Sequence, residues 1–153
     1  MRTGHVSAGL AIVVVLTAAM TGCAGRSSSP QASAEPSPPI TPRTARSVLT
    51  HYQRVNNSAN ASFNGGLEAS VETAAQLTID QTGYVIQKHQ DQPYKPFTFR
   101  RPVFYIPSLS GTARRWFAAD AITGSGKKKE DQLLLFVQQK PGAPWKLGWR
   151  VGT

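Results

Sequence analysis

Residues 145–151 read Trp-Lys-Leu-Gly-Trp-Arg-Val, with a large apolar side chain at every second position. In a β-strand successive side chains point to opposite faces, so this alternation predicts a strand with one apolar and one polar face. Trp145, Leu147, Trp149 and Val151 would share the apolar face. A strand of this kind decides the fold class, because its apolar face must be covered by a second layer of structure.

Three further strands are predicted upstream of this stretch. They are 97–105, 116–122 and 133–139, and turn-forming stretches separate them at 108–112, 124–129 and 140–144. Connections this short join antiparallel neighbours. The sequence therefore predicts a curved antiparallel β-meander of about four strands.

The earliest of these strands contains a proline that limits its place in the sheet. Pro102 cannot donate a ladder hydrogen bond, which predicts a sheet edge or a β-bulge. With regular alternation, Phe97, Phe99, Val103 and Tyr105 would lie on one face.

Two helices are predicted before the strands. Thr41 can cap the first, and Pro42 follows at the position that tolerates a missing N–H. Its apolar stripe has helical spacing and consists of Val48, Tyr52, Val55 and Ala59. Asn64-Gly65-Gly66 would end it. The second helix is predicted over 67–80, with Leu67, Val71, Ala75 and Ile79 inward and Gly83 as its end.

The order of these elements predicts an α+β domain over residues 44–153, with two N-terminal helices packed on the sheet. This order, with a long helix and a curved sheet rich in Trp and Phe, resembles the cone-shaped fold of ketosteroid isomerase and scytalone dehydratase. The resemblance implies a cavity between the first helix and the sheet. No motif aligns with the isomerase's catalytic residues, so none is assigned here.

The N-terminus is typical of a processing signal. Arg2 is followed by an uncharged run from Val6 to Met20, which is shorter than the ~20 residues that a membrane-spanning helix needs. Met20-Thr21-Gly22-Cys23 then resembles the lipobox of bacterial lipoproteins. This resemblance implies cleavage before Cys23, lipid attachment to its thiol, and a location on the extracytoplasmic face of the cell membrane. The alternative is a secreted protein with a free Cys23.

The segment after the cysteine is predicted to be a tether. Residues 1–22 would be the signal peptide, and 23–43 the acylated cysteine and a disordered linker rich in Pro and Ser. The folded part also resembles small uncharacterised lipoproteins of actinobacteria through its Arg54-Val55-Asn56-Asn57 run.

A cone-shaped domain could hold a small molecule. Tyr52, Trp116, Asp120 and Trp145 are the candidate pocket residues, because Asp120 interrupts an apolar strand and aromatic side chains would line a cavity. The alternative is that the aromatic residues form the core and Asp120 is solvated. No catalytic constellation, metal-ligand spacing or cofactor motif is present. We therefore expect a non-enzymatic binding domain, with a small-molecule binder or enzyme using Tyr52 and Asp120 as the alternative.

Basic residues dominate the charge, since 17 Lys and Arg against 8 Asp and Glu give a net charge of +9. Two doublets, Arg100-Arg101 and Arg114-Arg115, are candidates for binding anionic lipid head groups or cell-wall polymers. The alternative role is solubility and protection of sheet edges. Export disfavours nucleic acid, so the expected partners are the membrane, reached by the lipid anchor, an anionic envelope component, or another envelope protein.

Overall fold

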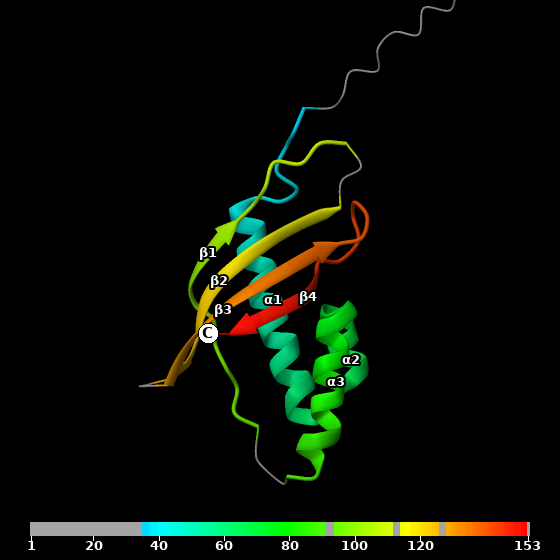
Figure 1. Cartoon of the computed structure of the whole chain (residues 1–153), viewed down its shortest axis with the longest axis vertical. Helices are drawn as coiled ribbons and strands as arrows, with labels where there is room; N and C mark the ends of the chain where they lie inside the picture. The colour runs from blue at the N-terminus through cyan, green and yellow to red at the C-terminus, as the bar shows by residue number, and fades with distance from the viewer. Residues whose placement is uncertain (1–34, 91–93, 112–113, 126–127, 153) are drawn as a thin grey trace, which may run out of the picture. The chain divides into compact units, whose positions relative to one another are not determined.

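The computed structural model describes residues 35–90, 94–111, 114–125 and 128–152. The predicted signal peptide, Cys23 and the tether as far as residue 34 lie outside the described residues. The elements are α1 (Pro42–Ser62), α2 (Gly65–Val71), α3 (Ala74–Lys88), β1 (Arg100–Tyr105), β2 (Arg115–Ser125), β3 (Lys128–Gln138) and β4 (Lys146–Gly152) (Figure 1). The α+β class and the antiparallel meander in the order β1-β2-β3-β4 are confirmed.

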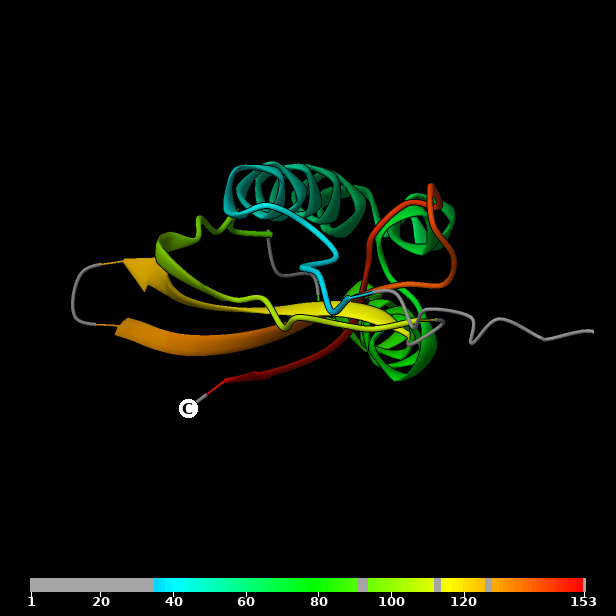
Figure 2. The ribbon, with the colours of Figure 1, turned by 90° about the horizontal axis from the view of Figure 1, so that it is seen from above.

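α1 begins where the sequence predicts. Thr41 has extended backbone angles, and its hydroxyl oxygen accepts from the Thr44 N–H at 3.2 Å. The helix ends at Phe63, whose φ of 49° is left-handed. Seen edge-on in Figure 2, α1 lies over one face of the sheet, which we call the inner face.

The second predicted helix is two helices, so three rather than two precede the sheet. The break falls at Glu72 and Thr73, where Glu72 is extended and the Thr73 N–H donates to the Leu147 carbonyl at 2.9 Å. A backbone that pairs with β4 cannot continue a helix at the same residues. Because α3 starts after this break, a different side of the helix faces the core. Ile79 is therefore 58% exposed, contrary to prediction, and Gln76 is buried instead.

Gly83 does not end α3, contrary to prediction. A Cβ at this glycine would meet nothing within 4 Å, and the helix continues to Lys88. A single exposed glycine lowers helix stability by only about 1 kcal/mol relative to Ala. Tyr84 therefore lies inside α3, which is helical as far as Lys88.

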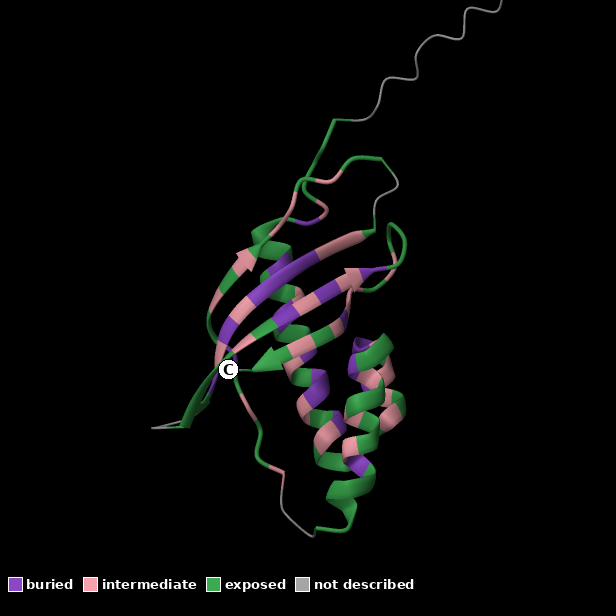
Figure 3. Cartoon of the chain, in the orientation of Figure 1, coloured by how far each residue is buried: buried purple, intermediate pink, exposed green. Residues whose placement is uncertain are grey.

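The core lies between α1 and the inner face of the two central strands, where buried residues gather (Figure 3). Phe117 of β2 stands opposite Phe136 of β3, and their rings stack with centroids 4.9 Å apart. Tyr52 from α1 meets Phe136 edge-on at 5.7 Å. All three side chains are at most 1% exposed, so aromatic packing joins the helix to the sheet.

Each edge strand carries a bulge. Beyond the bulge, side chains face the opposite side of the sheet from the one predicted. In β1 the register shifts between Arg100 and Val103, at the predicted site of Pro102, and Arg101 has a φ of 51°. The extra residue turns Val103 and Tyr105 to the outer face, where they are 53% and 52% exposed. Phe104 points inward instead and packs on the core.

In β4 the register shifts where Leu147 and Trp149 pair with successive residues of β3, which leaves Gly148 unpaired. Leu147 is fully buried, whereas Trp149 is 44% exposed on the outer face. Arg150 stands opposite the buried Leu134, so it lies on the inner face. The predicted single face for all four apolar residues is therefore wrong.

The folded part begins earlier than residue 44. Ser37 and Leu109 exchange backbone hydrogen bonds of 2.9 and 3.0 Å, and Ile40 is buried in the core. Residues 37–43 thus belong to the domain rather than to the tether. Among the residues that the structure describes, no helix combines the length and the apolar character needed to span a bilayer.

Candidate functional site

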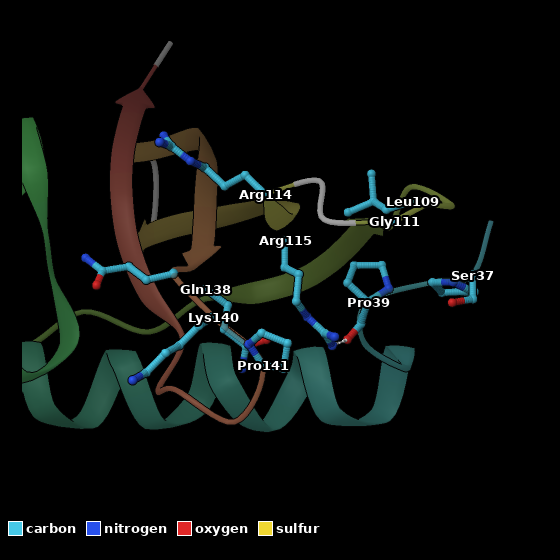
Figure 4. Close-up of a pocket in the computed structure, with 11 residues that line it drawn as sticks. Ser37, Pro39, Leu109, Gly111, Arg114, Arg115, Gln138, Lys140 and Pro141 are labelled. Carbon is cyan, nitrogen blue, oxygen red and sulfur yellow. Dashed lines mark hydrogen bonds between the residues drawn. The ribbon is translucent and has the colours of Figure 1, made fainter. Parts of the chain in front are cut away.

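A groove of about 470 Å³ lies where the chain enters the domain. Its walls come from residues 37–39, 109–111, 114–115 and 138–141, and we call it the entry groove (Figure 4). Arg114, Arg115 and Lys140 supply three cationic side chains, and none of the lining residues is acidic. The groove is therefore suited to an anion.

Arg115 is held in the groove by a hydrogen bond to the backbone. Its guanidinium donates to the Pro39 carbonyl, and its Nε is buried without a hydrogen-bond partner. The side chain reaches toward Pro39 in Figure 4, whereas Arg114 extends away from it and is exposed. Opposite, the Gln138 amide donates to the Ala143 carbonyl at 2.6 Å, and its Oε1 has no partner. The groove thus combines exposed cationic side chains with two buried polar atoms that have no hydrogen-bond partner among the described residues.

The other predicted doublet lies elsewhere. Arg100 stands opposite Ile122 of β2, and its guanidinium donates to the Gly124 carbonyl. Arg115 begins the same strand seven residues earlier, which corresponds to roughly 23 Å at the usual rise per residue. Arg101 is exposed at the bulge. The structure therefore brings Arg114 and Arg115 into one groove and leaves Arg100 and Arg101 outside it.

The four predicted pocket residues do not share a pocket. Tyr52 is 1% exposed on the inner side. Trp145 also lies there, 5.1 Å from Phe117 between ring centroids. Trp116 and Asp120 line a shallow hollow of about 560 Å³ on the outer face. The sheet separates Tyr52 from Asp120, so they cannot act on one small molecule.

A buried cluster of carboxylates lies on the inner side, and sequence spacing did not indicate it. Glu68, Glu72 and Asp80 each place one oxygen within 4.8 Å of the others. Glu68 and Glu72 are fully buried, and Asp80 is 12% exposed. They come from α2, its C-cap and α3, and both helices contact β4. We call these three residues the carboxylate cluster.

Hydrogen bonds from α1 and α3 hold the carboxylate cluster. Tyr52 donates to Glu72 Oε1 at 2.9 Å, and Tyr84 donates to Glu68 Oε2. Asn56 donates to Glu68 Oε1 at 2.5 Å and to Glu72 Oε1 at 3.4 Å. The cluster therefore ties α1, α2 and α3 together through groups that would otherwise be unsatisfied in the interior.

Arg150 provides the opposing charge because the bulge in β4 turns it inward. Its Nη2 lies 3.5 Å from Asp80 Oδ1. Burial by itself would lower the pKa of Arg150, but Tyr52, Asp80, Glu72 and Glu68 around it raise that pKa above its usual value. The guanidinium thus stays charged beside the carboxylates.

Burial also shifts the pKa values of the acidic groups in this region. It raises the pKa of Glu72 from 4.5 to about 9, with further contributions from Asp80 and Glu68. Burial, followed by the neighbouring acids, raises the pKa of Tyr84 above its usual range, and that of Tyr52 rises mainly through burial too. Glu72 therefore holds a proton at neutral pH when nothing else balances the negative charge.

Two sequence signals point to this cluster in retrospect. Glu68 and Glu72 are one helical turn apart, on the same side as the buried Val71. Asn56 lies one turn after Tyr52 and continues its buried stripe. The adjacent Asn57 bonds Tyr94 at 2.5 Å and the Phe97 backbone. The Asn56-Asn57 pair thus organises the interior rather than the surface.

The sequence matches, over residues 36–151, the model of a family described as a domain of unknown function (DUF8094). This chain belongs to that family. This chain is 29% identical over 146 residues to the uncharacterized lipoprotein SCO6871 of Streptomyces coelicolor, a match that covers 86% of this chain. The resemblance to actinobacterial lipoproteins is thereby confirmed.

The match covers only 41% of the length of that relative, so this chain spans about two fifths of it. No solved structure matches the DUF8094 domain. Its likeness to the ketosteroid isomerase cone therefore stays a prediction.

Proposed function

We propose that this chain is a membrane-anchored lipoprotein whose domain binds an anionic component of the cell envelope in the entry groove. The lipid anchor is supported by the lipobox ending at Cys23 and by a relative that is itself named a lipoprotein. The observation that carries the binding role is a groove with three cations and no acidic lining residue.

The position of the groove along the chain supports an envelope ligand. Ser37 lines the groove and is fourteen residues from Cys23. Even a fully extended segment of that length spans at most about 50 Å. The groove would then work close to the outer surface of the membrane, among phospholipid head groups and the bases of wall polymers. Phosphate groups in either would match the planar donors of arginine.

Binding to isolated cell wall and to anionic vesicles tests the role of the groove. We expect lipid-free protein, residues 24–153, to sediment with one or both at low salt and to be released as salt rises, because exposed charges are screened over about 8 Å at physiological ionic strength. The paired change Arg114→Gln and Lys140→Gln should weaken binding by about tenfold or more. Arg115 is left intact because it also bonds Pro39.

The matched control removes two charges far from the groove. Arg100→Gln with Arg101→Gln changes the net charge equally and should weaken binding much less. Equal losses in the two double variants would mean that only overall charge matters. Binding that ignores salt would contradict an electrostatic site. Neutral vesicles serve as the reference for adsorption that does not depend on charge.

The lipid anchor has a separate test. Replacing Cys23 by Ser removes the thiol that lipid attachment requires, so incorporation of radiolabelled palmitate should stop and protein should appear in the medium. Labelling that persists in the Ser variant would refute attachment at Cys23. Retention of the unlabelled protein in the cytoplasm would refute export.

A further inference from the structure

We propose that the carboxylate cluster binds a calcium ion, independently of the entry groove. Glu68, Glu72 and Asp80 come from three consecutive segments of the chain, and one oxygen of each lies within 4.8 Å of the others. Oxygens on opposite sides of Ca²⁺ stand about 4.6–5.2 Å apart, because the ion binds oxygen at 2.3–2.6 Å. Three oxygens within 4.8 Å of one another are therefore close enough to bind one such ion together.

Two buried oxygens, one in the cluster and one beside it, have no hydrogen-bond partner among the residues that the structure describes. Glu72 is fully buried, yet its Oε2 accepts nothing. Gln76 is 2% exposed; its amide nitrogen donates to Asp80 Oδ1 at 3.0 Å, while its Oε1 has no partner. A buried acceptor without a donor is unfavourable by about 1–3 kcal/mol. A cation held by the cluster would satisfy Glu72 Oε2, and Gln76 is the buried neighbour whose amide group already contacts the cluster at Asp80.

The charge around the cluster also fits a divalent ion. With all three carboxylates of the cluster ionised, the guanidinium of Arg150, 3.5 Å from Asp80, would leave two negative charges in the interior. Uncompensated buried charge is strongly destabilising. One Ca²⁺ balances it, and a proton on Glu72 balances only half of it.

The donor set selects the kind of metal. Carboxylate and amide oxygens favour calcium or magnesium, whereas zinc and copper sites use His or Cys. Mg²⁺ binds oxygen at only 2.0–2.1 Å and demands a near-ideal octahedron, so opposite ligands stand about 4.2 Å apart. Ca²⁺ accepts an irregular set of six to eight oxygens, which suits carboxylates that come from three different segments.

An ion would have a route to the site. Asp80, Tyr84 and Arg150 also line an open pocket of about 230 Å³, whose other walls include Asn60 and Tyr94. This pocket reaches the edge of the carboxylate cluster and can hold the water ligands that complete a coordination number of six to eight.

Terbium luminescence and calorimetry test the site in the lipid-free chain, residues 24–153, after removal of metal by EDTA. Tb³⁺ replaces Ca²⁺ and emits when a nearby aromatic ring absorbs light, and the hydroxyls of Tyr52 and Tyr84 both bond the carboxylate cluster. We expect sensitised emission that Ca²⁺ displaces and Mg²⁺ displaces at least tenfold less effectively. Calorimetry should give one Ca²⁺ per chain, with a Kd near the 0.1–1 mM of extracellular calcium modules.

Matched variants separate the cluster from surface charge. Glu72→Gln keeps an acceptor for Tyr52 but removes one ligand charge, and should weaken Ca²⁺ binding at least tenfold; Asp80→Asn, at the partly exposed edge, should do the same. Glu130→Gln removes a charge from the exposed hairpin and should change nothing. No emission and no heat in the folded wild type would overturn the proposal, and so would an equal loss in Glu130→Gln. Circular dichroism confirms that each variant is folded.

Discussion

The entry groove and the carboxylate cluster are the two charged regions of the domain, and they differ in how their charge is held. The groove carries Arg114 and Lys140 on exposed loops, whereas Arg115 begins β2 and donates to the Pro39 carbonyl. The cluster carries anions in the interior, where tyrosine and asparagine donors fix each fully buried carboxylate. Charge in the groove is available to a partner, whereas charge in the cluster is part of the packing.

This difference predicts opposite responses to mutation. Changes in the carboxylate cluster should act on stability, because they leave buried groups without partners. Changes in the entry groove should act on binding and leave stability almost untouched, because exposed side chains contribute little to folding.

The largest effect is expected for Glu68→Ala. This change removes the acceptor of Tyr84 and the nearer of the two acceptors of Asn56, and both donor residues are buried. We expect the free energy of unfolding to fall by about 2–5 kcal/mol, measured by urea denaturation. A loss below about 0.5 kcal/mol would mean that water reaches the cluster and satisfies these donors.

The pH dependence of stability sharpens the comparison further. In the metal-free protein the folded state keeps a proton on Glu72 up to about pH 9, whereas the unfolded chain releases it near 4.5. The folded state therefore binds more protons between these values, and stability should fall as pH rises, by at most about 1.4 kcal/mol per pH unit. Glu68, Asp80, Arg150 and Tyr52 are the charged or titratable groups around Glu72.

The side chain in Glu72→Gln cannot titrate, so the stability of this variant should depend less on pH. Its free energy of unfolding should therefore rise relative to that of the wild type as pH increases. The measurement is urea denaturation in EDTA across this pH range. Parallel curves for the two proteins would place the responsible group elsewhere.

A smaller effect is expected for Tyr52→Phe. The ring keeps its contacts with Phe136 and Phe99, but the hydrogen bond to Glu72 Oε1 is lost. We expect a loss of about 1–2 kcal/mol in thermal or urea unfolding. Tyr105→Phe on the exposed outer face is the matched control and should change stability by less than about 0.5 kcal/mol.

The smallest effect on stability belongs to the groove. Arg114→Gln with Lys140→Gln should shift the free energy of unfolding by no more than about 0.5 kcal/mol, because both side chains are exposed. Its effect should appear only in the binding of anionic vesicles or cell wall. A clear loss of stability in this variant would show that the groove cations are structural, and would break the contrast between the two regions.

Much of the fold could be predicted because its signals are local. Thr41 and Pro42 mark the start of α1 through their own backbone chemistry, and the short apolar run from Trp116 to Ile122 between turn-forming stretches marks β2. The site could be predicted only in part. Arg114 and Arg115 were candidates by charge, but their separation from Arg100 and Arg101 depends on strand register, which charge does not encode.

The carboxylate cluster was not predicted because it forms through contacts between residues that are far apart in the sequence. Glu72 leaves the helix only where its backbone pairs with Leu147, more than seventy residues later. An acidic residue in a helical stretch is usually on the solvent side. The donors brought by Tyr52, Asn56 and Tyr84 make burial of Glu68 and Glu72 tolerable.

The sequence by itself determined the α+β class, the start of the first helix and the central strands, because caps, turns and side-chain periodicity act over a few residues. The tertiary structure alone decided which face each edge strand shows. One extra residue at Gly148 turns Trp149 outward and Arg150 inward, over the carboxylates. A bulge exists only in relation to the neighbouring strand, so its effect on every later side chain is fixed by pairing rather than by local sequence.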